Sequence, residues 1–410
     1  MKLALVTRRY PPLIGGAEKV LSYLATALAA EGADVTVLTS RIPGLGLAEQ
    51  EDVPIEAAGP VRRKGNDPRG RLKVVRLATS GLRFWGTWLY MRNLRRWFEQ
   101  NPVDLAYVSM LKHDAYATIA AGRRHGFPVV LRPEGAGATG DVAWQNRGNF
   151  GRRIGRRCRH AAGFVAISKA IEDELRHAWT TGTMRGSLLD ERVHRSPEMP
   201  RIFAIPNGVP VPATPWQRRP DGRASPRAAF VGRLAPEKGL DTLIDAWPAV
   251  RAAHPDARLI LIGEGPERPD LEAKVAARGL TLGPGQAVEM PGAAPDATAA
   301  LRDADLFVLP SREEGMSIAL LEAMALGVPI VASSIPGNRR LIGDFKHGRL
   351  APPDDPEGLA RIINEQWANF DRAFHMSRAA RSRVEQEFSI RIVARKHLEL
   401  FQELVGHRHK

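Results

Sequence analysis

The sequence predicts an α/β protein made of two Rossmann-like halves, each with a parallel sheet. Short apolar runs alternate with longer amphipathic stretches, which is the pattern of strands alternating with helices. At 410 residues, the chain is too long for one comfortable hydrophobic core. A stretch dense in Pro and Arg marks the boundary. We therefore expect a first domain over residues 1–209, a linker over 210–226, a second domain over 227–385 and a C-terminal helix over 386–410.

Composition narrows the class of partner. The apolar fraction of 44% is typical of a globular protein, and the formal net charge of +14 favours nucleotide sugars, acidic lipid surfaces or nucleic acid. Cys158 is the only cysteine, which excludes an internal disulfide framework and indicates a reducing compartment. The apolar run at the N-terminus is too short for a secretory signal, and no window approaches the length of a membrane span. We therefore expect a cytoplasmic protein.

The first half opens as a strand, a helix and a strand, over Leu3–Thr7, Ala17–Glu31 and Asp34–Thr39. Gly15 and Gly16 stand at the first turn, without the Gly-x-Gly-x-x-Gly fingerprint of dinucleotide-binding proteins. The glycine pair either lets a phosphate or an acceptor approach the start of the helix or forms a plain helix-entry turn.

The rest of the first half continues the alternation. Residues 41–71 are rich in Gly, Pro and charge and predict a mobile loop, and residues 178–200 predict an irregular insertion. The expected strands cover residues 72–77, 104–109, 128–132, 163–167 and 202–205, and the expected helices cover 81–100, 114–124 and 169–177.

Two stretches of the first half are strongly basic. The helix expected over residues 81–100 interleaves Phe84, Trp85 and Trp88 with arginines. These aromatic side chains either pack in the core with arginines covering the rim or contact an anionic membrane surface. The arginine run of residues 147–160 is either a solvated helix face or part of the same basic surface.

The second half repeats the alternation after the linker. The expected strands cover residues 228–232, 258–262 and 287–290, and the expected helices cover 240–253, 270–278 and 297–302. The tail, residues 370–410, is expected to be helical.

The most informative stretch lies between two strands, residues 305–309 and 328–332. Glu314 and Gly315 turn the chain, and Ser317 can cap a helix over 318–326 that Gly327 ends. Glu314 therefore lies at the carboxyl end of a strand, where open α/β sheets bind ligands. The free backbone amides of Met316, Ser317 and Ile318 form a natural anion site.

Glu314 and Glu322, with seven residues between them in this strand–loop–helix setting, resemble the signature of the family-four (group 1) retaining glycosyltransferases of the GT-B fold. The resemblance implies two Rossmann-like domains facing each other across a cleft, with the C-terminal helix crossing back to the first domain. It also implies that Glu314 contacts the donor sugar and Glu322 holds the nucleotide ribose. The alternative is a solvated loop charge and a surface helix residue. However, Glu322 stands in an otherwise apolar helix, where a solvated charge is out of place.

Arg233 and Lys238 stand five residues apart across a strand–helix turn, with Gly232 before them. Fixed cations there stabilise a diphosphate leaving group more strongly as the glycosyl bond breaks. The alternative is two exposed cations in a basic protein. The resembling family carries the same Arg-x-x-x-x-Lys pair on the donor diphosphate, and it carries a glycine pair like Gly15 and Gly16 beside the donor pyrophosphate.

The remaining donor contacts are expected at neighbouring strand ends. Gly265, in the sequence Gly-Glu-Gly, and Met290 are expected to shape the nucleotide pocket. The expected substrate-binding residues on the donor side are Gly15, Gly16, Gly232, Gly265, Met290, Gly315, Met316, Ser317, Ile318 and Glu322.

The acceptor side departs from the family pattern. Many relatives place a His before the glycine that follows the strand ending near Arg132, whereas this chain has Glu134 there. Glu134, as a catalytic candidate, and Asp141 and His113, as substrate-binding candidates, are expected on this side. An isolated His in a loop is more often simply exposed.

A metal is not expected. Asp303-Ala-Asp305 looks like the Asp-x-Asp metal signature of the other large glycosyltransferase fold, but it leads directly into a buried strand beside Arg302. No His or Cys cluster has metal-ligand spacing.

These observations predict a retaining glycosyltransferase, without cofactor or metal, that moves a sugar from a UDP- or GDP-sugar to an acceptor. The basic surface suggests a lipid-linked acceptor or an envelope glycan, and a peripheral place at the inner membrane surface. One alternative is a non-hydrolysing sugar-nucleotide epimerase of the same fold. Another is a basic module that binds membranes or nucleic acid, but such a module needs neither the glutamate pair nor Arg233 and Lys238, and we expect no nucleic-acid partner. The sugar, the base, the acceptor and the oligomeric state stay open.

Overall fold

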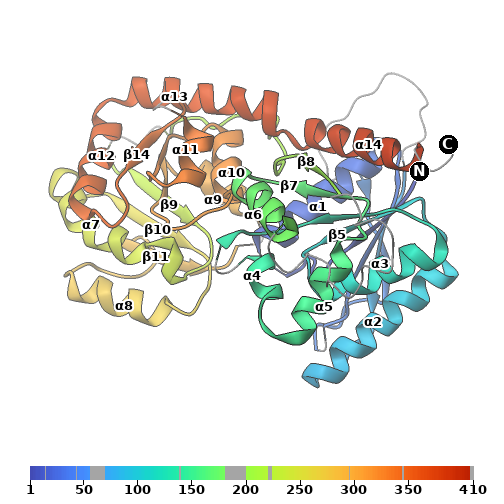
Figure 1. Cartoon of the computed structure of the whole chain (residues 1–410). Helices are drawn as coiled ribbons and strands as arrows, with labels where there is room; N and C mark the ends of the chain where they lie inside the picture. The colour runs from blue at the N-terminus through green and yellow to red at the C-terminus, as the bar shows by residue number, and fades with distance from the viewer. Residues whose placement is uncertain are drawn as a thin grey trace. The chain divides into compact units, whose positions relative to one another are not determined.

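The computed structural model describes residues 1–13, 15–42, 44–55, 70–137, 140–180, 200–219, 224–294, 296–343 and 346–406 (Figure 1). The chain divides into two compact units. The first comprises residues 1–13, 17–208 and 390–410, and the second comprises 14–16 and 209–389. Each unit contains its own sheet, and each is described by itself below.

The first unit is built on a sheet in which every strand pair but one is parallel. Its strand order is β3-β4-β2-β1-β5-β6-β7-β8. The strands are β1 (Lys2–Val6), β2 (Asp34–Ser40), β3 (Gln50–Asp52), β4 (Leu72–Leu77), β5 (Leu105–Ser109), β6 (Val129–Arg132), β7 (Gly163–Ala166) and β8 (Arg201–Ala204).

The short strand β3 corrects the loop predicted over residues 41–71. It pairs antiparallel with β4, and its three residues, Gln-Glu-Asp, are all exposed. Backbone pairing and an ion pair between Glu51 and Arg76 at 2.9 Å hold this polar edge strand, so it has no hydrophobic period that sequence reasoning could detect. Residues 43 and 56–69 of the predicted loop, and residues 181–199 of the predicted insertion, lie outside the described residues.

Helices cover both faces of the first sheet. On one face, α1 (Gly16–Ala30) shares a core with α14 (Ile390–Gly406), whose buried Phe401 belongs to the same hydrophobic cluster as Leu21 and Leu28 of α1. The other face carries α2 (Arg83–Gln100), α3 (His113–His125), α4 (Asp141–Gln145), α5 (Gly148–Cys158) and α6 (Lys169–Thr180). The C-terminal helix is therefore part of the first unit.

Helix α2 divides into a buried face and an exposed one. Tyr90, Leu94 and Phe98 are buried in the core. In contrast, Phe84 and Trp85 are 85% and 65% exposed. The first turns of α2 therefore present aromatic rings to solvent. Helix α2 as a whole packs against α3 (Figure 1).

The second unit contains a fully parallel sheet of order β11-β10-β9-β12-β13-β14. The strands are β9 (Arg227–Val231), β10 (Arg258–Ile262), β11 (Val288–Gly292), β12 (Leu306–Leu309), β13 (Ile330–Ser333) and β14 (Arg349–Ala351). The helices are α7 (Leu240–Ala253), α8 (Arg268–Ala277), α9 (Ala297–Arg302), α10 (Ile318–Leu326), α11 (Pro336–Ile342), α12 (Pro356–Ala368) and α13 (Phe370–Arg383). Helix α7 packs against α8 and α12, whereas α10 packs against α9 and α13 (Figure 1).

Local signals in the second half predicted its elements closely. The helices over 240–253 and 318–326 and the strand over 258–262 have the predicted bounds. The Oγ of Ser317 accepts a hydrogen bond from the amide of Leu320 at 3.3 Å, and Gly327 ends α10 with φ of 85°. The predicted cap and stop of α10 are confirmed.

The tail and the predicted linker are more structured than the sequence suggested. Between α13 and α14 the chain forms a π-helical turn, Val384–Phe388, and Ser389 is extended, so the helical tail has a break. In the described part of residues 210–226, Trp216 is buried, and its Nε1 donates to the carbonyl of Ala304 at 2.7 Å. The extent of the linker stays a prediction. No helix in the described ranges is both long enough and apolar enough to cross a membrane.

Candidate active site

The candidate site lies at the carboxyl edge of the second sheet. Strands β9 and β12 are neighbours at its centre and run in parallel. The loop after β9 carries Arg233 and Lys238, and the loop after β12 carries Glu314. Because parallel strands end at the same edge, residues far apart in sequence meet there.

Lys238 and Glu314 form an ion pair at this edge. The Nζ of Lys238 lies 2.8 Å from the Oε1 of Glu314, and the two side chains are only 19% and 9% exposed. The hydroxyl of Ser311 donates to the same oxygen at 2.8 Å. Glu314 is therefore held between a cation and a hydroxyl, and it is not the solvated loop charge of the alternative interpretation.

Arg233 and Glu322 occupy contrasting environments. Arg233 is exposed in the loop after β9. Glu322 is 5% exposed in α10, whose other residues from Leu320 to Leu326 are also buried. The surface alternative for Glu322 is therefore wrong, whereas its predicted contact with a ribose stays a prediction. Met316 and Ser317, which begin the predicted anion site, are buried at the start of α10.

One glycine lets two neighbouring loops of the second unit lie close together. A Cβ on Gly265 would lie 2.1 Å from the carbonyl oxygen of Leu234, so only glycine fits where the loop after β10 meets the loop after β9. Met290 lies in β11, and its carbonyl accepts hydrogen bonds from Arg268 at 3.2 and 3.3 Å. Gly15 precedes α1, and Gly16 is its first residue. Gly265 and Met290 thus lie on adjacent strand ends, and the predicted nucleotide contacts of all four residues stay predictions.

The first unit places Glu134 just after β6. Its carboxylate pairs with Arg132 and accepts a hydrogen bond from Ser109. Arg132, 3% exposed, also donates to the Oδ1 of Asn207 at 2.6 Å. Glu134 is thus fixed by side chains at the ends of the strands, and its contact with an acceptor stays a prediction.

Asp141 ties two loops of the first unit together. One carboxylate oxygen accepts the amide of Glu134 at 2.8 Å, and the other accepts that of Leu111 at 3.3 Å. Asp141 is 4% exposed, and this burial raises the pKa of its carboxyl. These contacts give Asp141 a structural task that the sequence did not predict, because both partners come from other strand ends.

His113 is partly buried at the first turn of α3. Its ring stacks on Phe150 with centroids 5.3 Å apart and meets the edge of Trp144 at 5.5 Å. Burial, with smaller effects from Arg8 and Lys112, lowers the pKa of His113. His113 therefore belongs to an aromatic cluster and is not simply exposed.

The Asp-x-Asp sequence lies away from the candidate site. Asp305 precedes β12 at the amino edge of the sheet and is 4% exposed. Its Oδ2 accepts hydrogen bonds from Arg219 at 2.6 Å and from the amide of Arg227 at 2.9 Å. Across the described residues, no group of three or more His, Cys, Asp or Glu side chains is arranged to hold a metal ion.

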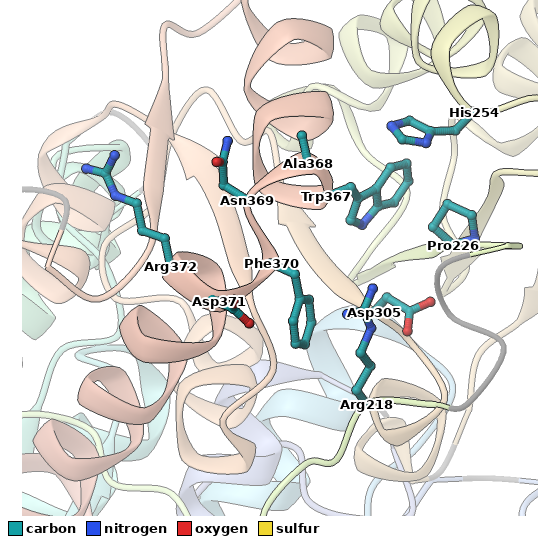
Figure 2. A pocket seen from close by; sticks show the side chains of 10 residues that line it. All are labelled: Arg218, Pro226, His254, Asp305, Trp367, Ala368, Asn369, Phe370, Asp371 and Arg372. Atoms are coloured by element: carbon teal, nitrogen blue, oxygen red, sulfur yellow. The ribbon is translucent and has the colours of Figure 1, made fainter.

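The same amino edge of the second unit contains a cavity of about 670 Å³ (Figure 2). Arg218 lies over the ring of Phe370, 3.6 Å from its centroid, and the rings of His254 and Trp367 meet edge to face. The lining residues are Arg218, Pro226, His254, Asp305, Trp367, Ala368, Asn369, Phe370, Asp371 and Arg372. Because Pro226 and Asp305 directly precede β9 and β12, this cavity is separate from the carboxyl edge.

Two family models match the chain. Residues 225–369 match the model described as glycosyl transferases group 1, and residues 14–181 match the model described as glycosyltransferase family 4. The chain belongs to the group 1, family-four glycosyltransferases. It is 28% identical over 408 residues to a glycogen synthase of Mycobacterium tuberculosis, covering 96% of this chain and 92% of that protein.

Solved structures confirm the GT-B fold of this glycosyltransferase. The sucrose-phosphate synthase of Thermosynechococcus elongatus matches with a TM-score of 0.74 over 99% of both chains, at 20% identity. Anabaena Alr3699/HepE, solved in complex with UDP and glucose, matches with a TM-score of 0.69 over 98% of this chain and 99% of its own, at 17% identity.

Proposed function

We propose that this glycosyltransferase moves a sugar from a UDP- or GDP-sugar to an acceptor with retention of the anomeric configuration and without a metal. The observation that carries the proposal is the Lys238–Glu314 pair, with its 2.8 Å contact at the carboxyl edge of the second sheet. A cation held there is ready to pair with a diphosphate. The exposed Arg233 in the same loop supplies a second cation that can grip two oxygens.

In the proposed reaction, the bond between the anomeric carbon and the diphosphate oxygen breaks, and a bond from that carbon to the acceptor oxygen forms. The acceptor's hydroxyl proton passes to the departing phosphate on the same face. Lys238 and Arg233 stabilise the negative charge that the phosphate gains, which is worth most in the transition state. Glu314 lies beside the donor sugar, and Glu322 holds the ribose.

The test begins with a thermal-stabilisation screen of nucleotide sugars, with UDP-sugars first because a chain of this fold binds UDP. NMR of the product's anomeric proton follows, with and without excess chelator. An inverted product would transfer the catalytic role to Glu134 or Asp141, and loss of activity in chelator would exclude the metal-free reaction. Turnover of the donor without any acceptor, giving an epimer, would favour the epimerase.

The acceptor in this proposal is a lipid-linked or envelope glycan at an anionic membrane surface, and the enzyme docks there from the cytoplasmic side. The first turns of α2 expose Phe84, Trp85 and Trp88, the last at 50%. Trp88 lies edge-on to Trp85 and under the guanidinium of Arg92, whose carbon is 5.5 Å from the ring. Exposed aromatic rings beside cations suit an anionic bilayer interface, where rings enter the headgroup layer and cations meet phosphates.

Helix α5 adds charge to the same unit. Arg152, Arg153 and Arg156 are exposed on it, and α5 packs against α3, which in turn packs against α2. These three arginines are therefore solvated, and α5 lies on the face of the sheet that also carries the exposed rings. Such a surface binds acidic lipid through several weak contacts, so salt weakens the binding.

Vesicle flotation tests this docking surface. At low salt the protein should float with vesicles containing acidic lipid, and the double change Trp85→Ala and Trp88→Ala should abolish flotation. Leu282→Ala is the matched control, because Leu282 is a 42% exposed apolar residue in the second unit. Absence of flotation at low salt, or flotation unchanged by the tryptophan changes, would favour an acceptor in solution.

A further inference from the structure

Arg312 joins the two loops that carry the Lys238–Glu314 pair. Lys238 and Glu314 lie 76 positions apart in the chain, so their 2.8 Å contact requires the loop after β9 and the loop after β12 to hold a fixed spacing. Arg312 stands two residues before Glu314 in the second of these loops and is 32% exposed at its side chain.

Each nitrogen of the Arg312 guanidinium has a different partner. Nη1 donates to the carbonyl of Pro236 at 2.7 Å, in the loop of Lys238. Nη2 donates to Asp241 at 2.7 Å, in the first turn of α7. Nε donates to Asp354 at 2.6 Å, in the loop after β14. One planar fork thus connects the loop after β12, which carries Arg312 itself, to the chain after β9 and to the loop after β14.

Backbone contacts also hold the loop after β9 against the loop after β12. The amide of Arg312 donates to the carbonyl of Glu237 at 2.8 Å. Gly239 has φ of 62°, and a Cβ there would lie 2.4 Å from the carbonyl oxygen of Pro310. The two loops are therefore in backbone contact at two points, at Arg312 and at Pro310.

Opposite charges also stabilise the contacts of Arg312 with Asp241 and Asp354. Its hydrogen bonds to Asp241 and Asp354 raise the pKa of Arg312. Burial opposes ionisation of Asp241, yet the bond and charge of Arg312 bring the pKa of Asp241 below its usual value. Without Arg312, the carboxylates of Asp241 and Asp354 would lose the cation that they share.

We propose that Arg312 is a positioning residue of the donor site. It fixes the loop of Lys238 against the loop of Glu314, so that the ammonium and the carboxylate stand where the donor diphosphate and sugar meet them. The proposal rests on the proposed donor site. Arg312 itself needs no contact with the donor, because each of its nitrogens already donates to the protein.

Two substitutions separate geometry from charge. Arg312→Gln removes the cation and the three-way contact, and we expect kcat to fall about 10- to 100-fold. Arg312→Lys keeps the charge but reaches one partner at a time, so we expect a partial rescue. Arg278→Gln is the matched control, because it breaks another Arg–Asp pair of the second unit, with Asp245 at 2.8 Å, and should keep kcat within about twofold. Full activity in Arg312→Lys would overturn the geometric role.

A double-mutant cycle tells positioning from a general loss of stability. If Arg312 acts through the pair, Arg312→Gln should change kcat less than about twofold once Lys238→Ala is present. UDP affinity, measured by calorimetry on the same proteins, should show the same non-additivity. Additive losses would overturn the proposal, and so would wild-type kcat in Arg312→Gln while Lys238→Ala is impaired.

Failure of the donor site is distinguishable from failure of the positioning role. If Lys238→Ala and Glu314→Gln leave kcat unchanged, the proposed donor site is wrong, and the positioning role of Arg312 is wrong with it. If both of these variants have a lower kcat and Arg312→Gln does not, only the positioning role of Arg312 is wrong. Should Arg312→Gln not fold, Asp354→Gly removes one of the three contacts, suits the φ of 56° at this position, and enters the same cycle in its place.

Discussion

The Nζ of Lys238 and the Oε1 of Glu314 are 2.8 Å apart, although the two residues come from loops after different strands. The hydroxyl of Ser311 reaches the same oxygen, and Ser333 donates in turn to the carbonyl of Ser311. The site is therefore assembled from the ends of β9, β12 and β13. A charged group held by such neighbours is preorganised, which favours stabilisation of charge as it develops.

Glu314→Gln should lower kcat by about 10²-fold, because it removes the charge that holds Lys238 and that, in the proposed donor site, faces the donor sugar. The amide can still accept the hydrogen bond of Ser311, so the loop should keep its shape. Steady-state kinetics with the best donor from the screen measures the effect, and circular dichroism checks the fold. A loss confined to the KM for donor would assign Glu314 to binding alone.

Glu322→Gln should weaken UDP binding about 10-fold, the usual worth of one hydrogen bond to a charged group. The substitution keeps the volume of the buried side chain, so it avoids the cavity that alanine would leave in α10. Calorimetry with UDP measures the affinity. Met324→Leu, a volume-conserving change at a fully buried position of the same helix, is the control and should bind UDP normally. Normal affinity in Glu322→Gln would contradict the ribose contact.

Ser317→Ala should reduce stability by about 1 kcal/mol, because Ser317 caps α10 through the amide of Leu320. Ser317→Asn should restore most of the loss, since asparagine also caps helices well. The midpoint of urea unfolding measures both. Equal midpoints for the alanine variant and the wild type would show that the cap contributes little here.

His397 should make the protein less stable in mild acid. The residue is 3% exposed in α14, where its Nδ1 is 2.8 Å from the carbonyl of Val393 and its Nε2 is 3.1 Å from the hydroxyl of Tyr107. Burial lowers the pKa of His397 to about 4. Below its usual value near 6.5 the unfolded chain binds a proton that the folded chain refuses, so stability falls as the pH drops toward 4.

This effect should amount to about 2 kcal/mol at pH 5 relative to pH 7. His397→Gln cannot titrate but can still contact Tyr107, so the wild type should lose more stability than this variant between the two pH values. Urea unfolding at pH 7 and pH 5 gives the difference. His375→Gln, at an exposed position of α13, should follow the wild type. Parallel losses in the wild type and His397→Gln would rule out the linkage.

Much of the second unit could be predicted because its signals are local. The short, continuous apolar run of residues 306–309 is typical of a buried strand, and it forms β12. Ser317 and Gly327 fix the ends of α10 by capping interactions that act within one helical turn. The matched bounds of α7 and β10 have the same origin. Where such signals were absent, as at the polar strand β3, the sequence predicted a loop.

Ser311 and Arg312 were not predicted as site residues. Their roles depend on partners 3 to 76 positions away, and Asp354 is 42 positions from Arg312. A charged residue in a loop carries no sign of which other loop it will meet. The same limit applied to Asp141, whose two backbone partners come from the ends of other strands.

The sequence by itself determined the α/β class, the two halves, the strand and helix of the glutamate motif and the identities of Lys238 and Glu314. Only the tertiary structure decided that the pair is in contact, that Arg312 connects its loops, and that the rings of Trp85 and Trp88 face solvent while Leu94 is buried. The physical reason is range. Helix caps and hydrophobic periods act over a few residues of one segment, whereas the strand order β10-β9-β12-β13 brings distant segments to one edge and selects which side chains meet there.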